Sequence, residues 1–172
     1  MTDRRLVWRL GVFSSLTLLF SAAVHASPAT DKVIANVKLP PGFTLEVYAD
    51  NVPFARSMAL GSKGTLFVGT RKGPVYAISG TPGSGQKPTV RTIAEKLNQP
   101  NGVAFRDGAL YVAEVSRVTR YDGIEDSLDH VPQAKVVRDD FPKDGHHGWK
   151  YIAFGPDGKL YVPIGAPCNI CE

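Results

Sequence analysis

The sequence predicts an all-β chain built from the four-stranded blades of a β-propeller, and three observations support that prediction. Segments of the chain repeat one template, tight turns divide each copy, and the copies recur at the spacing of propeller blades. Of the 172 residues, 43% are hydrophobic and 21% are charged, which is typical of a globular protein. The 17 glycines and 13 prolines favour many turns and short strands.

The template is a short apolar strand, a glycine-containing turn and a strand that begins Leu-aromatic-Val. It occurs at residues 56–68, 101–112 and 150–162. The dividing turns are Gly61-Ser-Lys-Gly64, Arg106-Asp-Gly108 and Gly155-Pro-Asp-Gly158. Glycine supplies a positive φ and proline a fixed one, and the flanking residues are rich in Val, Ile, Phe and Tyr. Each copy therefore predicts a β-hairpin.

Further strands complete the predicted blades. Third strands are expected at 74–78 and 117–121, and fourth strands at 89–94 and 134–138. The Leu-aromatic-Val units begin at Leu66, Leu110 and Leu160, which are 44 and 50 residues apart. A period of about 40–50 residues with four strands per unit is typical of propeller blades. A β-sandwich with coincidental hairpins is the alternative.

The chain supplies two blades and the first hairpin of a third, whereas propellers typically carry about four to eight blades. We expect an incomplete propeller from a truncated or partial gene product, in preference to a ring completed by other chains. An isolated piece would expose an apolar blade face and a sheet edge. The predicted organisation is a signal peptide at 1–26, a linker at 27–38 and a partial propeller domain at 39–172.

The N-terminus has the pattern of an export signal. Arg4, Arg5 and Arg9 precede an apolar run at 10–23, and Val24-His-Ala26 offers a cleavage site. The run is shorter than the roughly 20 residues of a membrane span, so a membrane anchor is the weaker alternative. A twin-arginine route fits poorly. We expect a secreted or periplasmic protein, with no membrane span after cleavage, in an oxidising compartment.

Charge and cysteine content exclude several functions. Residues 1–26 hold three of the 20 basic and one of the 16 acidic residues, so the rest of the chain has 17 basic and 15 acidic residues. This part has no basic cluster, which gives no reason to expect nucleic acid binding. Cys168 and Cys171 predict a disulfide, or pairing with residues beyond the chain end. Glu172 stands where c-type haem attachment needs histidine, and two thiols are too few for structural zinc.

Several segments together resemble the sorbosone dehydrogenase group of the PQQ-dependent sugar dehydrogenases. The segments are 39–53, which resembles the first strand of that group, 66–73, 100–105, 109–114, Asp144-Gly-His-His-Gly-Trp-Lys150 and 165–172. The ordered set is more specific than any single repeat. The similarity covers roughly residues 36–172 and only the N-terminal part of such an enzyme.

The resemblance implies a six-bladed propeller that holds pyrroloquinoline quinone (PQQ) at the top of its channel, commonly with Ca²⁺. It implies oxidation of an aldose or a sorbosone-type aldehyde, hydride transfer to the quinone and a separate electron acceptor. The calcium ligands and the principal cofactor anchors are expected in later blades. No metal ligand is predicted in this chain.

The resemblance implies that His147, eight residues before Gly155, is the catalytic base. A neutral imidazole suits proton abstraction. A surface-loop histidine, or one that packs on Trp149, is the alternative. His146 stands where related enzymes carry an acidic residue, so Asp144 is the candidate partner that orients the imidazole. A solvated loop aspartate is the competing interpretation.

The repeat gives an independent set of cofactor-binding candidates. Arg56, Asn101 and Lys150 occupy equivalent positions and would ring the channel, where cations suit a tricarboxylate such as PQQ. Ordinary solvated strand starts are the alternative. Arg71, in a loop of the first blade, and Gln99, near the polar residue of related enzymes, complete the set.

The sequence contains no dinucleotide fingerprint, P-loop, serine elbow or His-x-x-x-His, which argues against nicotinamide, nucleotide and serine-hydrolase chemistry. Two alternatives remain. One is a non-catalytic propeller that binds other proteins, since fold does not fix function. The other is a lactonase-like propeller with a channel metal, for which Asn101 is thin support.

Overall fold

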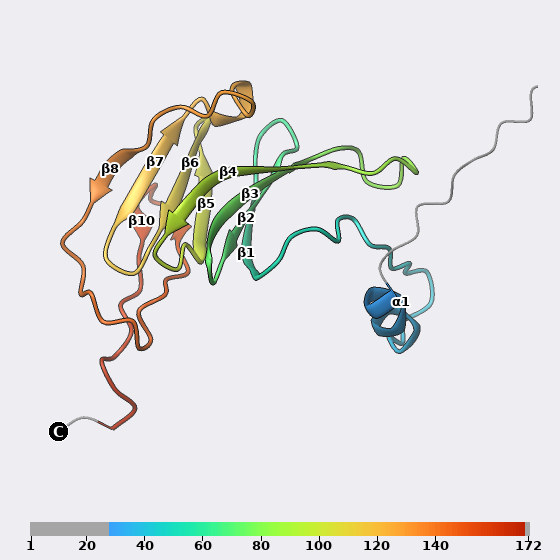
Figure 1. The fold of residues 1–172 in the computed structure, drawn as a ribbon, viewed down its shortest axis with the longest axis horizontal. Coiled ribbons are helices and arrows are strands. Elements are labelled where there is room, and N and C mark those ends of the chain that lie inside the picture. The colour runs from blue at the N-terminus through green and yellow to red at the C-terminus, as the bar shows by residue number, and fades with distance from the viewer. Residues whose placement is uncertain (1–27, 171–172) are drawn as a thin grey trace, which may run out of the picture.

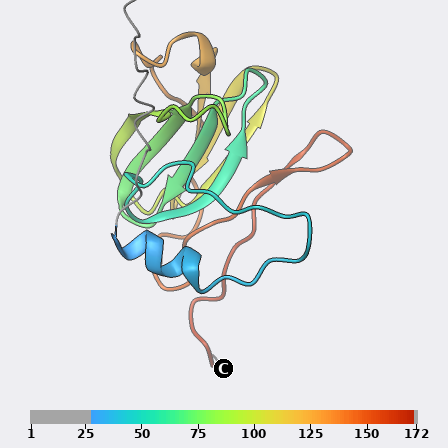
Figure 2. The same ribbon diagram turned by 90° about the vertical axis from the view of Figure 1, so that its right-hand side faces the viewer.

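The computed structural model describes residues 28–170, which form two stacked four-stranded antiparallel sheets and a small hairpin (Figures 1 and 2). The predicted signal peptide and Cys171 lie outside the described residues. A single short α-helix, α1 (Pro28–Ala35), falls within the predicted linker and lies apart from the sheets (Figure 1).

The strands follow the predicted blades. Blade 1 has the order β1 (Ala55–Leu60), β2 (Leu66–Thr70), β3 (Gly73–Ser79) and β4 (Thr89–Leu97). Blade 2 has the order β5 (Gly102–Arg106), β6 (Ala109–Ala113), β7 (Val118–Asp122) and β8 (Lys135–Arg138). The hairpin consists of β9 (Ala153–Phe154) and β10 (Leu160–Tyr161). The predicted third and fourth strands are all present, and the prediction of a partial propeller is confirmed.

The turns show why these strands pair. In the β1–β2 turn, Gly61 N donates to Thr65 O at 2.8 Å and Gly64 has φ +86°. The β9–β10 turn repeats this arrangement, since Gly155 N donates to Lys159 O at 2.9 Å. The β5–β6 turn is a two-residue loop with positive φ at both Asp107 and Gly108, as a type I′ turn requires. The repeat in the sequence is thus a repeat of backbone hydrogen bonding.

The main core lies between the two blades. It joins side chains of both sheets and of the turn after β7: Phe67, Val75, Ala77, Ile93, Val103, Leu110, Val112, Tyr121 and Ile124. The rings of Phe67 and Phe105 stack across the interface with centroids 5.6 Å apart. Because neither sheet covers its own apolar face, each blade is stabilised by burying that face against the other.

Two smaller clusters cover the outer faces of this pair. Ile152 of the segment before β9 packs with blade 2 residues such as Ala113 and Val118, and the Tyr111 and Phe154 rings meet edge to face at 5.0 Å. On the opposite side, Tyr48 and Val52 pack over the outer face of blade 1. Four consecutive layers therefore bury one another, from the 48–52 segment to the third hairpin.

The prediction of a strand at 39–53 is wrong for this structure. No residue between α1 and β1 is in a strand. A strand needs a neighbour to satisfy its backbone groups, and no described strand pairs with this segment. The segment instead lies against blade 1, where the Tyr48 hydroxyl donates to Gly80 O at 2.9 Å.

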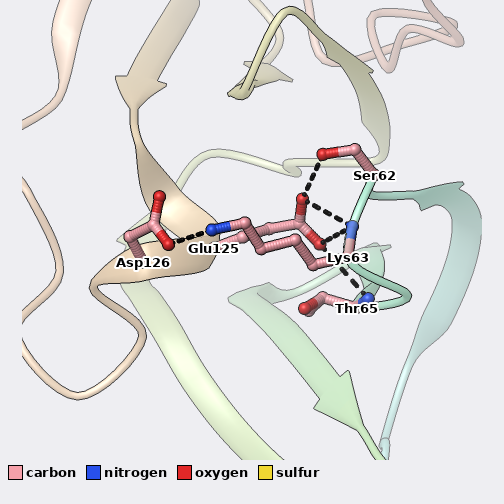
Figure 3. A network of polar contacts seen from close by, with 5 residues as sticks. All are labelled: Ser62, Lys63, Thr65, Glu125 and Asp126. Carbon is pink, nitrogen blue, oxygen red and sulfur yellow. Dashed lines mark hydrogen bonds and ion pairs between the residues drawn. The ribbon is translucent and has the colours of Figure 1, made fainter.

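A polar contact also fastens the blades together, as Figure 3 shows. Glu125, in the short 3₁₀ turn Ile124–Asp126 of blade 2, accepts hydrogen bonds from the β1–β2 turn of blade 1. Its donors are Ser62 Oγ at 2.9 Å, Lys63 N at 3.0 Å and Thr65 N at 3.3 Å. Beside it, Lys63 Nζ pairs with Asp126. A β-carbon on Gly61 would collide with the Glu125 carboxylate, so a larger residue there would displace that side chain from these hydrogen bonds.

Candidate functional site

The three equivalent repeat positions are joined in series where the first strands of the blades begin. Arg56 Nε on β1 donates to Asn101 Oδ1 at 3.3 Å, and Asn101 Nδ2 donates to Lys150 O at 2.7 Å. Ser57 Oγ donates to the Asn101 carbonyl. The first strands themselves are neighbours, since β1 contacts β5 and β5 contacts β9. The repeat therefore places one polar residue of each blade in a single row.

Close backbone packing supports this row. A β-carbon on Gly102 would stand 2.6 Å from Lys150 O, and one on Gly69 would collide with the Asn101 carbonyl. Real β-carbons do not approach that closely, so these two glycines allow neighbouring blades to meet at Asn101. Asn101 itself is only 7% exposed, and its side-chain oxygen and nitrogen are both used.

Lys150 differs from the other two members of the row because its side chain is buried, with 1% exposed. Its ammonium donates to Gly148 O at 3.0 Å and lies 5.5 Å from the centre of the Phe141 ring. Burial lowers the pKa of Lys150, because the charged form loses its hydration. The structure thus joins the exposed Arg56 to the buried Asn101 and keeps the Lys150 ammonium inside.

Two arginines converge on one tryptophan. The Arg56 guanidinium carbon lies 4.8 Å from the centre of the Trp149 ring, and that of Arg71 lies 4.9 Å from it. Arg71 follows β2, and its backbone N donates to Phe54 O at 3.1 Å. The electron-rich face of an indole attracts cations at such distances. Trp149 therefore holds two exposed positive charges beside Asn101.

A cavity of about 450 Å³ opens at this place. Its lining residues are Arg56, Ser57, Asn101, Trp149, Tyr151 and Pro163. Aromatic and proline side chains supply flat apolar walls, and Arg56 and Asn101 supply polar groups. This combination suits a planar ligand that carries acidic groups.

The charge balance makes the two arginines distinctive. Every other arginine within residues 28–170 forms an ion pair: Arg91, Arg106, Arg117, Arg120 and Arg138. In that same part of the chain, neither Arg56 nor Arg71 has an acidic partner. Their guanidinium groups remain available for an anion, and arginine binds carboxylates in a two-pronged geometry.

His147 lies in the exposed loop before Trp149 and has a left-handed backbone with φ +52°. Its Nδ1 is 3.1 Å from Ala166 O, and its ring centroid is 4.0 Å from that of His146. Asp144 is exposed, and no hydrogen bond joins its carboxylate to His147 in the described structure. Gln99 is half-buried, also has a positive φ, and lies beside Gly145 of the histidine loop.

Sequence reasoning missed two residues of this region. Trp149 holds the arginines, and its position two residues after His147 in the Asp144–Lys150 motif was the available signal. Glu114 is 3% exposed and accepts a hydrogen bond from Asn98 N at 2.6 Å, which fixes the loop leading to Asn101. Its hydrogen bond also raises the pKa of Arg117. No pattern in the sequence separates Glu114 from an ordinary surface glutamate.

The described residues contain no group of three or more His, Cys, Asp or Glu side chains that could hold a metal ion. Cys168 is disulfide-bonded. None of the helices in residues 28–170 has the length and apolar character to cross a membrane.

No protein-family profile matches the sequence. A curated relative, an uncharacterized protein of Borreliella burgdorferi, is 22% identical over 170 residues. The match covers 92% of this chain and 43% of the relative, so the chain spans less than half the relative's length.

Three solved structures share the fold. The first is the holo form of the pyranose dehydrogenase PQQ domain of Coprinopsis cinerea, with TM-score 0.61, 10% identity and coverage of 72% of this chain and 30% of that one. The second, a calcium structure of a Trichoderma reesei AA12 carbohydrate-active enzyme, has TM-score 0.57, 20% identity and coverage of 67% and 30%.

The third is the PQQ-bound form of an aldose sugar dehydrogenase of Streptomyces coelicolor, with TM-score 0.52, 21% identity and coverage of 70% and 40%. At such identities the likeness is one of fold. The chain consists of two blades and one further hairpin of a β-propeller, and it spans at most 40% of these three structures.

Proposed function

We propose that the chain is the N-terminal part of an exported PQQ-dependent dehydrogenase that oxidises an aldose or a sorbosone-type aldehyde. The observation that carries this proposal is the pair Arg56 and Arg71, which have no acidic partner among residues 28–170 and are held on Trp149 beside Asn101. PQQ is a planar tricarboxylate, so it matches both the charge and the flat walls of the cavity. The similar folds of a PQQ domain, a calcium-containing enzyme and a PQQ-bound dehydrogenase support the same assignment.

Each candidate residue would have its own role in binding the cofactor. Arg56 and Arg71 would bind carboxylates, Asn101 would fix their orientation, and Gln99 would contribute from the adjoining loop. Lys150 would act through its carbonyl, which holds Asn101, since its ammonium is buried. When bound, PQQ would supply the oxidising power, as the acceptor of a hydride from the sugar carbon. The ligands of Ca²⁺ are expected in other blades of the complete protein.

His147 would serve as the base that removes the hydroxyl proton of the substrate. The ring is exposed, so a substrate could reach it. The orienting role of Asp144 remains a prediction. The electrons would then leave to a separate acceptor, and the pattern at residues 1–26 supports a reaction in the periplasm or outside the cell.

Cofactor binding can be tested through Trp149, which is the only tryptophan besides Trp8. In a chain carrying Trp8→Phe, added PQQ should quench tryptophan emission in a saturable manner. The double variant Arg56→Ala/Arg71→Ala should bind at least about tenfold more weakly, because each charged hydrogen bond is worth about 1.5–3 kcal/mol. The matched control is Arg91→Ala, which removes an arginine already paired with Asp129.

Free tryptophan corrects for absorption of light by the ligand. Identical titration curves for the parent chain and the double arginine variant would contradict the proposed site.

A further inference from the structure

The contact between His147 and Ala166 determines which nitrogen of the imidazole carries the proton. His147 Nδ1 lies 3.1 Å from Ala166 O, within hydrogen-bonding distance. A carbonyl oxygen can only accept a hydrogen bond, so Nδ1 must be the donor. In the neutral ring the proton then stands on Nδ1, and the lone pair stands on Nε2.

The glycine before Ala166 makes this contact possible. A β-carbon on Gly165 would collide with the His147 carbonyl oxygen and would stand 2.8 Å from the His147 β-carbon. Backbone atoms of the two segments therefore meet directly, with no side chain between them. Any residue other than glycine at position 165 would push the Ala166 carbonyl away from the imidazole.

The histidine loop is shaped for the same contact. His147 has φ +52°, a left-handed conformation that is uncommon for residues with a side chain. A β-carbon on Gly148 would collide with Asp144 O, so the next residue is also held tightly. Strained backbone of this kind persists where the surrounding structure enforces it, and it is frequent at functional sites.

We infer that the Gly165–Ala166 backbone positions His147, with the Ala166 carbonyl fixing the tautomer in which Nε2 is the free base. Gly165 is thus a positioning residue, and the partner of the imidazole is a neutral carbonyl in place of the predicted Asp144 carboxylate. The inference rests on the proposed function only where it gives the free Nε2 the role of a catalytic base. The tautomer itself is a property of the chain without cofactor or substrate.

The test is long-range ¹H–¹⁵N NMR of the full chain with labelled histidine, at about pH 8.5, roughly two units above the ordinary histidine pKa. For His147 the ratio of Nδ1–H to Nε2–H should exceed that of His146 by about fivefold, the factor for a net hydrogen bond of about 1 kcal/mol. His146 is the internal reference, because within the described structure its ring nitrogens form no hydrogen bond. Equal ratios for the two rings would overturn the inference.

Variants locate the cause. Gly165→Ala should return the His147 ratio to that of His146, whereas Gly145→Ala should leave it unchanged, since a β-carbon there meets only Gln99 Nε2 at 3.8 Å. Asp144→Asn should also leave the ratio unchanged. A shift with Asp144→Asn, or none with Gly165→Ala, would assign the orienting role to another group and overturn the inference.

These outcomes are independent of cofactor binding. Should Gly165→Ala fail to fold, the ratio in the unaltered chain still decides the question. If PQQ does not bind but the His147 ratio is raised as expected, the proposed function is rejected and the tautomer inference stands.

Discussion

Charged residues around the candidate site differ in their burial and in their partners. Glu114 and Lys150 are both buried, at 3% and 1% exposure, and each is bonded to backbone that shapes the approach to the site. Arg56 and Arg71 have the opposite character, since they are exposed and contact an aromatic ring instead of a carboxylate. Sequence position made both arginines candidates, and the structure adds that both contact Trp149.

Lys150 gives a prediction for the pH dependence of stability. Burial lowers its pKa below the ordinary lysine value of 10.5, so the unfolded chain binds more protons than the folded chain between the lowered value and 10.5. The free energy of unfolding that Lys150 controls therefore rises with pH across that window. Urea unfolding at several alkaline pH values should show this rise in the parent chain and its loss in Lys150→Met.

The comparison variant is Lys159→Met, which alters an exposed lysine paired with Asp157. It should keep the pH dependence of the parent chain. Parallel stability curves for the parent chain and Lys150→Met would show that the buried amine does not carry this effect.

Among elements, the hairpins could be predicted because their turns are chemically explicit. The turns at Asp107-Gly108 and Gly155-Pro-Asp-Gly158 need positive φ values, which Asp107, Gly108 and Gly158 adopt, and each stands where a strand must reverse. The segment 39–53 has no comparable hairpin turn that would pair it locally with a second strand. Whether it forms a strand depends on a neighbouring strand, which is a long-range property, and the described chain offers none.

The same limit applies to the site. The repeat correctly placed Arg56, Asn101 and Lys150 at equivalent strand starts, because backbone period determines that position. It could not indicate that the Lys150 side chain turns inward. The sequence also could not predict the partner of the His147 imidazole, because the Ala166 carbonyl belongs to a segment with no distinguishing side chain.

The contact between blade 2 and the β1–β2 turn predicts an asymmetry between two neighbouring acids. Glu125→Gln places an amide NH₂ among donors that the carboxylate now accepts, so it should lower the free energy of unfolding by about 1–2 kcal/mol. Asp126→Asn breaks an exposed ion pair with Lys63 and should cost at most about 0.5 kcal/mol. Urea unfolding with unchanged m-values measures both, and equal losses would contradict the role given to Glu125.

At the scale of the whole molecule, stability depends on faces shared between layers. Blades 1 and 2 bury their largest common cluster against each other, and the candidate site lies where the first strands of the blades meet. Because Arg56, Asn101 and Trp149 come from successive layers, the site exists only while these layers stay packed. Fold stability and ligand binding should therefore be lost together.

Leu110 tests this coupling, because it is fully buried in the cluster between the blades. Leu110→Ala should destabilise the chain by about 2–5 kcal/mol, since it leaves a cavity that neither sheet can close alone. Leu60→Ala, at a leucine that is 68% exposed on β1, should change stability by less than about 0.5 kcal/mol. All these chains carry Trp8→Phe, so that far-ultraviolet circular dichroism reports on the strands and tryptophan emission reports on Trp149 at the site. Their unfolding midpoints should coincide in the parent chain and shift together in Leu110→Ala, because the blades unfold as one cooperative unit. Two separate transitions, with the Trp149 signal unaffected by Leu110→Ala, would show instead that the site is stabilised by the third hairpin and its loop alone.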